Sequence, residues 1–249
     1  YTKIIIMTVL VLGASGATGR LLAEQLLKEG VHVRVIVRSP DRLPESLKAN
    51  EQLEVIKATL LDLSDDELAG YVRGCSAVAS CLGHNLNLKG IYGQPRKLVT
   101  DATRRLCKAI RVNDPAARVK YVLMNTAGNS NRDLDEKVPL GQKIVIGLLR
   151  LVLPPHVDNE KAADFLRTEI GQDDPVIKWV AVRPDTLIDE EEVTEYVSTP
   201  SPVRSALFNP GKVSRINVAH FMAGLVTNEE IWQEWEGRMP VVYGKDYVG

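Results

Sequence analysis

The feature that most constrains the fold is a glycine-rich turn between an apolar segment and a helical pattern. Three glycines recur at every third position between residues 13 and 19. Residues 8–12 before them are apolar, as in a buried parallel strand, and residues 18–28 after them place leucines at helical spacing. Glycines in such a turn let a ligand approach the backbone closely, and the helix N-terminus favours a phosphate. The predicted phosphate-binding residues are Gly13, Ser15, Gly16, Ala17, Thr18 and Gly19.

Short apolar segments alternate with helical patterns along most of the chain. This alternation predicts a doubly wound parallel sheet of the Rossmann type, in the α/β class. We expect one domain over residues 1–249, with a small C-terminal region on the substrate side and a loop over residues 189–210. Ser64 is the expected N-cap of the second helix. The predicted strands are 8–12, 31–37, 53–56, 77–81, 119–124, 177–182 and 241–243, and the predicted helices are 18–28, 65–71, 96–111, 142–152, 159–170 and 218–226.

Charge and composition exclude several classes of protein. The formal net charge is −1, so no general attraction to nucleic acid is expected. No apolar run is long enough to span a membrane. The three cysteines, Cys75, Cys81 and Cys107, have no metal-binding spacing, and no metal site is expected. Scattered cysteines are typical of a reducing compartment, so a cytoplasmic location is expected.

The end of the second predicted strand indicates which dinucleotide would bind. An acidic residue about 20 residues after the glycine turn accepts the ribose hydroxyls of NAD in such folds. This chain has Arg38 at that place and Arg42 shortly after it, and a guanidinium group suits a 2′-phosphate. The sequence therefore favours NADP(H) over NAD(H). Asp41 leaves NAD open, and a solvated surface pair is the alternative for the two arginines.

Several further motifs follow the predicted strands in a fixed order. Together they make the chain resemble the atypical short-chain dehydrogenase/reductase family, in its NmrA-like and biliverdin/flavin-reductase-like branch. The glycine turn has the sequence GASGATG, and Arg38 follows the second strand. The other matching segments are residues 80–83, 124–128, 158–161, 179–184 and 214–219.

The resemblance implies roles for individual residues. Thr126 matches the active-site serine or threonine that faces the nicotinamide, and Lys161 matches the lysine that holds the nicotinamide ribose. Residues 80–83 would run beside the adenine ribose, and the backbone at Pro184 would pass the carboxamide. The cofactor contacts implied beyond the turn and the two arginines are Asp62, Leu63, Cys81, Leu82, Gly83, Met124, Asn125, Lys161 and Pro184.

Departures from the family pattern concern the proton donor. In the Y-x-x-x-K pattern the tyrosine would fall at Val157. His156 and Asp158 flank that position, and either could donate or relay a proton. His156 is the candidate proton donor because imidazole is well suited to this role near neutral pH. Each candidate also has an interpretation without a role in catalysis or cofactor binding. Thr126 would bond to local backbone, His156 would be a loop histidine, Lys161 a solvated helix residue, and Cys81 a small core residue.

Two functions of different classes fit these residues. The first is an NADP(H)-dependent oxidoreductase that passes hydride to a small carbonyl, quinone or flavin-like acceptor. The second is a non-catalytic dinucleotide sensor or assembly factor, which the absent tyrosine favours. Residues 144–155 are apolar on nearly every side. They are expected to be buried, to cap the substrate cleft, or to form a contact in a homodimer.

Overall fold

An eight-stranded sheet forms the centre of the protein in the computed structural model, which describes residues 7–84, 92–137 and 139–248. The strand order is β3-β2-β1-β4-β5-β6-β10-β8. Neighbouring strands are parallel except for β10 and β8, which pair antiparallel. The strands are β1 Thr8–Leu12, β2 His32–Val37, β3 Leu53–Lys57, β4 Ala77–Ser80, β5 Val119–Met124, β6 Ile177–Pro184, β8 Tyr196–Thr199 and β10 Val241–Gly244. A separate parallel pair is formed by β7 Thr186–Ile188 and β9 Lys212–Ser214.

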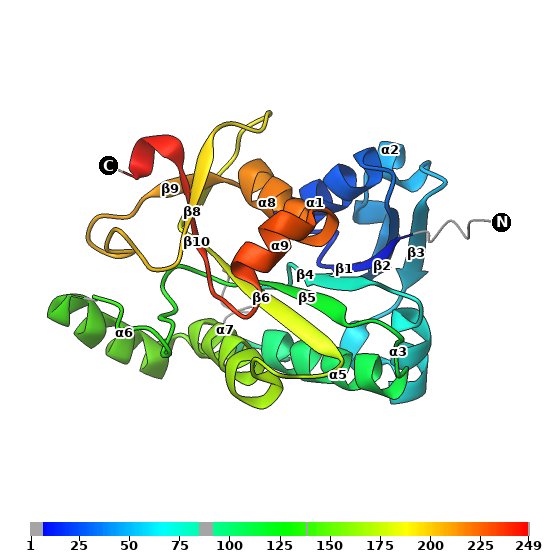
Figure 1. Ribbon diagram of the computed structural model, residues 1–249, viewed down its shortest axis with the longest axis horizontal. Helices are drawn as coiled ribbons and strands as arrows, with labels where there is room; N and C mark the ends of the chain where they lie inside the picture. The colour runs from blue at the N-terminus through cyan, green and yellow to red at the C-terminus, as the bar shows by residue number, and fades with distance from the viewer. Residues whose placement is uncertain (1–6, 85–91, 138, 249) are drawn as a thin grey trace.

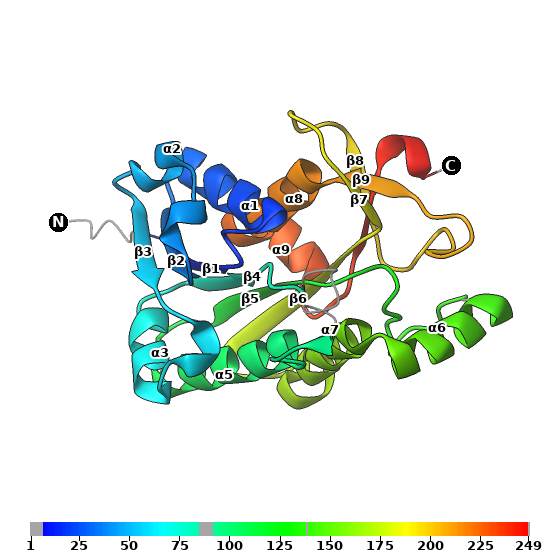
Figure 2. The same cartoon turned by 180° about the vertical axis from the view of Figure 1, so that it is seen from behind.

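Helices cover both faces of this sheet (Figures 1 and 2). One layer contains α1 and α8, which pack against each other, with α9 beside α8. The other layer contains α3, α5 and α7, while α6 extends from it toward one end of the molecule. The helices are α1 Ala17–Lys28, α2 Glu45–Lys48, α3 Asp65–Val72, α5 Leu98–Val112, α6 Leu140–Val152, α7 Pro154–Phe165, α8 Arg215–Thr227 and α9 Glu229–Trp235.

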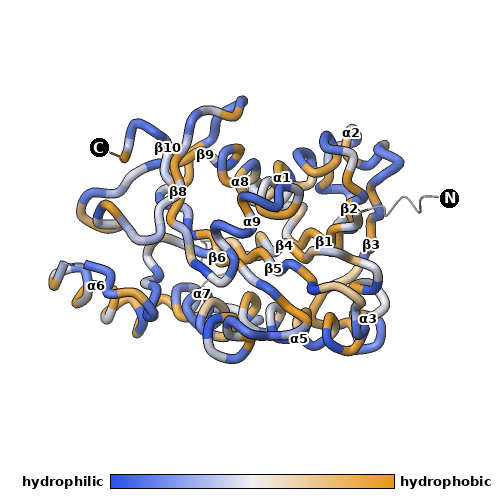
Figure 3. Tube along the Cα trace, viewed as in Figure 1, coloured by the Kyte–Doolittle hydropathy of each residue, from blue (hydrophilic) through white to orange (hydrophobic). Residues whose placement is uncertain are grey.

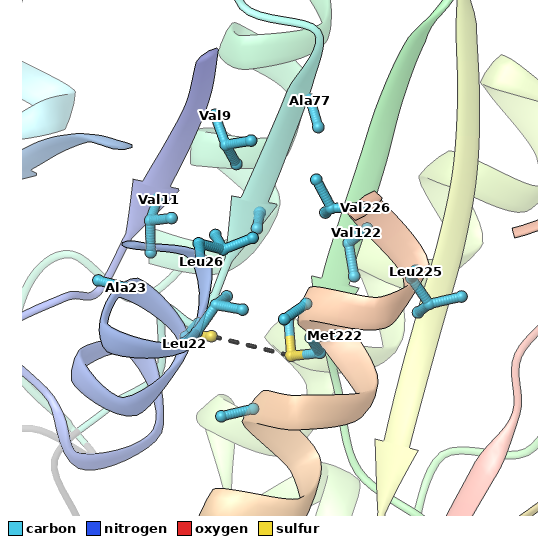
Figure 4. Packing of buried hydrophobic residues seen from close by; sticks show 14 of the residues in the cluster. Val9, Val11, Leu22, Ala23, Leu26, Ala77, Val122, Met222, Leu225 and Val226 are labelled. Atoms are coloured by element: carbon cyan, nitrogen blue, oxygen red, sulfur yellow. Dashed lines mark hydrogen bonds between the residues drawn. The ribbon is translucent and has the colours of Figure 1, made fainter. Parts of the chain in front are cut away.

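The two faces of β1 explain why its sequence is apolar throughout. Val9 and Val11 point into one hydrophobic cluster, and Leu10 and Leu12 point into the other. On the first face, Leu22 and other residues of α1 meet α8 near Met222 (Figure 4). Apolar stretches of the trace accordingly concentrate along the central strands (Figure 3). A strand buried on both faces cannot show the alternation of a half-buried strand.

The order of the strands creates a crevice at their C-terminal ends. The chain goes from β1 to β2 on one side, whereas β4 pairs with β1 on the other side. Connections therefore diverge between the ends of β1 and β4, and such switch points are where open α/β sheets bind ligands. The glycine turn follows β1, and residues 81–83 follow β4.

The predicted doubly wound sheet is confirmed, and β1 and β5 have the predicted bounds. Ser64 is the N-cap of α3 and forms a capping box with Glu67, as expected from its position. The helix predicted from residue 159 begins instead at Pro154. Prolines are compatible with the first turn of a helix, because the amides there have no partner inside the helix. Pro154 and Pro155 thus begin α7, and His156 lies on a helix.

The expectation of a loop over residues 189–210 was partly wrong. This segment contains β8, which pairs with β10 at the edge of the sheet. All four residues of β8 are half-buried, so the strand lacks a pattern of alternating burial. The pairing of β7 with β9 also escaped prediction, because each strand has only three residues. Trp232 and Trp235 are buried on α9 and pack in the hydrophobic core.

Candidate functional site

Each glycine of the turn occupies a position that a side chain would disturb in a different way. Gly13 has φ +78°, and a Cβ there would lie 2.5 Å from the carbonyl oxygen of Cys81. A Cβ on Gly19 would overlap the carbonyl of Gly13. A Cβ on Gly16 would meet only the Gly13 oxygen at 3.2 Å, within otherwise open space. Gly13 and Gly19 are therefore needed for folding of the turn, whereas Gly16 leaves room for a ligand.

The start of α1 offers backbone donors to that space. Gly16 is its N-cap, no side chain caps the helix, and its first turn contains no acidic residue. By contrast, Ser64 caps α3 and Ser214 caps α8 through their side chains. The first amides of a helix have no partner within the helix, and their positive end attracts an anion. The uncapped start of α1 is therefore suited to a phosphate.

A cavity of about 440 Å³ extends from the glycine turn across the ends of β1, β2 and β4. Its volume falls in the range of small-ligand pockets. The structure brings together there residues that the sequence predicted from four separate segments. The predicted residues that line the cavity are Gly13, Ser15, Gly16, Arg38, Arg42, Asp62, Cys81, Leu82 and Gly83.

Two exposed arginines stand at the β2 end of this cavity. Arg38 follows β2 directly, and Arg42 lies in the short helical turn Pro40–Arg42. Both line the cavity, whereas Asp41 between them does not. Asp62 lines the cavity from the turn Leu60–Asp62, after β3. The acidic group nearest to Arg38 along the chain is therefore not among the cavity residues.

Cys81 follows β4 in the wall of the cavity and belongs to the core behind it. Its Sγ lies 3.9 Å from Sδ of Met222. Burial raises the pKa of its thiol to about 12, so the side chain is a neutral thiol at pH 7. This agrees with the interpretation of Cys81 as a small core residue.

Thr126 and Asn125 follow β5 outside the set of residues that line the cavity. Thr126 Oγ1 accepts a hydrogen bond from the Gly128 amide at 3.3 Å, so the local backbone interaction named as the alternative is present. Asn125 donates from Nδ2 to the carbonyl of Asn159 on α7 at 2.8 Å. Its Oδ1 accepts from the amide of Thr126. These bonds fix the loop after β5 against α7.

His156 comes close to Thr126 at this end. A Cβ on Gly128 would lie 3.7 Å from His156 Cε1 and 3.7 Å from Thr126 Oγ1. The two side chains therefore flank the same glycine. Nε2 of His156 lies 3.4 Å from Oε1 of Glu160, one helical turn later on α7.

Glu160 is in turn held by a residue of α6. Arg150 donates two hydrogen bonds of 2.8 Å to the two carboxylate oxygens of Glu160. Burial acts to raise the pKa of Glu160, but the hydrogen bonds and charges of His156 and Arg150 outweigh it and lower the pKa to about 2. The carboxylate is therefore charged at pH 7 and lies beside the His156 ring.

The carboxylate of Asp158 forms hydrogen bonds within the protein that join α7 to α5. Its carboxylate accepts from the amides of Val99 and Thr100, at 2.8 and 3.0 Å, and so caps α5 from α7. Nε2 of His84 lies 2.8 Å from Oδ2 of Asp158, and both side chains are buried. Burial opposes ionisation of Asp158, yet the bonds from His84, Thr100 and Val99 leave its pKa below the usual value. These bonds thus favour the charged form of Asp158 and engage both of its carboxylate oxygens.

Lys161 is not brought to the cavity. Its side chain is exposed and lines a separate groove of about 320 Å³ between α5 and α7, together with Lys97, Thr100 and Arg104. This groove shares no lining residue with the cavity at the glycine turn. The solvated helix lysine named as the alternative describes this placement.

Other residues implied by the resemblance also lie outside the cavity lining. Leu63 offers its carbonyl to Arg105, and the carbonyl of Pro184 accepts from the amide of Ala127. The remaining predicted contacts that do not line the cavity are Ala17, Thr18, Gly19, Met124 and Asn125. Asn85 and Asn87, considered as polar contacts after β4, lie outside the described residues.

Two features of the site were missed by the sequence reasoning. Gln94 and Pro95, before α5, and Leu98, the first residue of α5, also line the cavity. No motif marks them, so nothing in the sequence could have placed them there. Arg183 was interpreted only through its backbone, but its side chain is fully buried and pairs with Glu136 at 2.8 Å. A charged residue inside an otherwise apolar strand, such as Arg183 in β6, is the signal that could have found this pair.

Comparisons with known proteins agree with this geometry. The model of the NAD(P)H-binding family matches residues 13–229 of the chain. No curated protein sequence is recognisably similar to it.

Solved structures with the same fold have low sequence identity to this chain. A wide-type short-chain dehydrogenase/reductase from Veillonella parvula in complex with NADP has a TM-score of 0.69 at 18% identity, covering 98% of this chain and 97% of that one. A candidate NADH-flavin reductase from Streptococcus pneumoniae has a TM-score of 0.66 at 18% identity, with 96% and 100% covered. An anaerobilin reductase from Escherichia coli has a TM-score of 0.64 at 17% identity, with 96% and 98% covered.

At these identities the structures establish the fold alone, a Rossmann-type domain. The family model spans the glycine turn, the arginines after β2 and the end of β4, which together build the cavity. The chain belongs to the NAD(P)H-binding family.

Proposed function

We propose that this protein is an NADPH-dependent reductase that acts on a small carbonyl, quinone or flavin-like acceptor. The observation that carries the proposal is the cavity in which the uncapped start of α1, Arg38 and Arg42 meet. Backbone amides would hold the pyrophosphate, and the space beside Gly16 would accommodate it. The ends of β2 and β4 would enclose the adenosine.

The preference for NADPH rests on the charges around the adenosine end. A 2′-phosphate carries extra negative charge, which a guanidinium group can bind through two parallel hydrogen bonds. Arg38 and Arg42 line the cavity while Asp41 does not. Asp62 faces the cavity from the β3 side, where it suits a hydroxyl or an amino group of the adenosine.

The other end of the cleft would hold the acceptor. Thr126 and His156 flank Gly128, and the charged carboxylate of Glu160 lies 3.4 Å from Nε2 of the imidazole. The bound cofactor would supply the hydride, as nicotinamides do in this kind of reaction. His156 would donate the proton to the reduced acceptor, and Thr126 would donate a hydrogen bond to its oxygen. Acceptors that are reduced easily depend less on such a donor, which suits a chain with Val157 at the tyrosine position.

A titration with NADPH and with NADH, followed by nicotinamide fluorescence, tests the cofactor preference. In Arg38→Asp we expect binding of NADPH to weaken by about 10- to 100-fold, the loss of a charge-assisted hydrogen-bond pair, with little change for NADH. Arg20→Asp is the matched control, since Arg20 lies on α1 near Glu24 and does not line the cavity. Equal losses for both dinucleotides would contradict the role of Arg38.

A screen of aldehydes, quinones and free flavins for oxidation of NADPH tests the reaction itself. With an aldehyde acceptor, His156→Ala should lower kcat by about 100-fold, the usual contribution of a general acid, and leave NADPH binding intact. His32→Ala is the control, because His32 begins β2 and therefore lies at the N-terminal ends of the parallel strands, opposite to the ends that form the site. A variant as active as the unmodified protein would remove His156 from the reaction.

A non-catalytic sensor is the second candidate, and the placement of Lys161 favours it. With Val157 at the tyrosine position and Lys161 in the outer groove, the pair typical of the resembled family is not assembled. A sensor would bind NADPH tightly and oxidise it with none of the acceptors. Tight binding of NADPH together with its oxidation by an acceptor would exclude this second function.

A further inference from the structure

Helix α6 exposes an apolar stripe to solvent. Leu140, Ile144, Leu148 and Leu151 are 75%, 58%, 59% and 79% exposed, and Val152 beside them is 57% exposed. Their spacing of four, four and three residues places the first four on one side of the helix. A helix on the surface of a globular protein normally turns such a side toward the core. This arrangement is therefore the reverse of the usual one.

Polar contacts fix α6 with this side outward. Gln142 is buried, and its Oε1 accepts a hydrogen bond of 2.5 Å from Ser205. Arg150 binds both oxygens of the buried Glu160 on α7. The polar side chains Gln142 and Arg150 thus anchor the helix, and Ile146 is its buried apolar contact. Rotating α6 to bury the stripe would break these bonds, so the exposed stripe is part of the folded arrangement.

A neighbouring loop extends the apolar surface. Phe208 is 62% exposed and lies against the first turn of α6, where a Cβ on Gly141 would be 3.4 Å from its ring. Val203 and Leu207 of the same loop are also exposed. The helix extends past the main body at this end of the molecule (Figures 1 and 2). We call this surface the α6 tip, formed by Leu140, Ile144, Leu148, Leu151, Val152, Val203, Leu207 and Phe208.

The charges around the α6 tip are mainly basic. The chain has no Asp or Glu from residue 137 to 157, nor from residue 196 to 228. Of the acidic residues that flank α6, Glu136 pairs with Arg183, Asp158 and Glu160 are buried, and Asp135 before the helix is exposed. Basic residues adjoin the tip in sequence at Lys137 and Arg204, whereas the charge of Arg150 is already paired with Glu160.

We propose that the α6 tip binds the surface of a membrane that contains anionic lipids. A projecting helix with an apolar side and basic neighbours is suited to lie in the interface, with its apolar side among the acyl chains. Basic residues would remain at the headgroups and add electrostatic attraction. At 13 residues α6 is about 20 Å long, and among the described helices none is long and apolar enough to cross a membrane.

A second copy of the same surface fits less well. Two α6 tips facing each other would bring basic residues against basic residues, with no acidic partner in either segment. An anionic surface satisfies both the apolar stripe and the charge, and does so independently of the cofactor and the acceptor.

Flotation with vesicles tests the proposal. The full chain should bind vesicles of phosphatidylcholine that contain phosphatidylglycerol, and bind them less as salt is added. The double variant Ile144→Glu, Leu148→Glu should reduce the partition coefficient at least about tenfold, because charges would enter the acyl region. Val112→Glu is the matched control, since Val112 is 64% exposed at the end of α5, away from α6. Thermal unfolding of all variants checks that they fold alike.

Three results would overturn the proposal. The first is no binding to the anionic vesicles. The second is binding that the double variant and the Val112→Glu control share to the same extent. The third is a dimer in light scattering that the double variant converts to a monomer, which would assign the α6 tip to a second copy. NADPH titration of the same variants should give unchanged affinity, so failure here is separate from failure of the proposed reductase.

Discussion

Two regions at the C-terminal ends of the strands, one at each end of the sheet, differ in how their polar groups are used. At the glycine turn the first amides of α1 have no capping side chain, and Arg38 and Arg42 are exposed toward a cavity. At the other end, polar groups are bonded to one another: Asp158 caps α5, and Glu160 binds Arg150. The first end thus keeps unsatisfied donors for a ligand, as an anion site needs. The second end uses its charges to hold helices together and leaves few groups for an acceptor.

Among the substitutions at these two ends, Gly16→Val at the glycine turn should have the largest effect, which is on cofactor binding. The backbone of Gly16 has φ −91° and ψ 165°, which valine adopts readily, so the fold should persist. The new side chain would occupy the phosphate space, and we expect NADPH affinity to fall at least 100-fold, about 2.7 kcal/mol. Calorimetric titration measures the affinity and thermal unfolding measures the stability.

Gly70→Ala is the control for this substitution. A Cβ on Gly70 has no neighbour within 4 Å, and alanine favours the helix α3. Its NADPH affinity should match that of the unmodified protein. If Gly16→Val bound NADPH normally, the phosphate would lie elsewhere.

The sequence predicted the glycine-turn end of the site better than the end that contains Glu160 and Lys161. The glycine turn, Arg38 and the residues after β4 act through backbone or through strand ends, which periodicity places well. Their convergence in one cavity was therefore predictable. Lys161 was placed by resemblance alone, and one helix position decides whether a side chain faces the cleft or the outer groove. Sequence spacing does not determine that rotation when the helix start is misplaced, as it was at Pro154.

Ion pairs of buried charged side chains were the other feature that the sequence did not predict. Arg183 with Glu136, and Arg150 with Glu160, join residues that lie on different elements. No local pattern marks such pairs, because the partners meet only when the sheet and its helices are assembled. The exposed stripe of α6 illustrates the same limit. The sequence left burial, a cap and a subunit contact open for residues 144–155, and burial is wrong for most of the stripe.

Asp158→Asn should test whether the second end is chiefly structural. The substitution keeps the shape, but one side-chain oxygen becomes an NH₂ group that faces an amide of Val99 or Thr100. We expect a loss of about 2–3 kcal/mol in the free energy of unfolding, from the weakened helix cap and the unpaired buried donor. Urea denaturation measures it. Asp66→Asn, an exposed change on α3, is the control and should cost less than about 0.5 kcal/mol. A loss no greater than in this control would show that the buried carboxylate contributes little to the fold.

The smallest expected effect is on the pH dependence of the free energy of unfolding, through Glu160. The pKa of Glu160 is lowered to about 2 in the folded protein, so its contribution is complete above the ordinary value near 4.5 and is lost as the pH falls toward 2. Between pH 5 and pH 3 the unmodified protein should lose about 1–2 kcal/mol more unfolding free energy than Glu160→Gln, the figure being reduced because Arg150 is nearly half exposed. Urea denaturation at several pH values measures the difference, and Glu191→Gln, in an exposed loop, should follow the unmodified protein. Parallel curves for Glu160→Gln and the unmodified protein would mean that the contacts of Glu160 with His156 and Arg150 add nothing to stability. The anchoring of α6 would then rest on Gln142 and Ile146 alone.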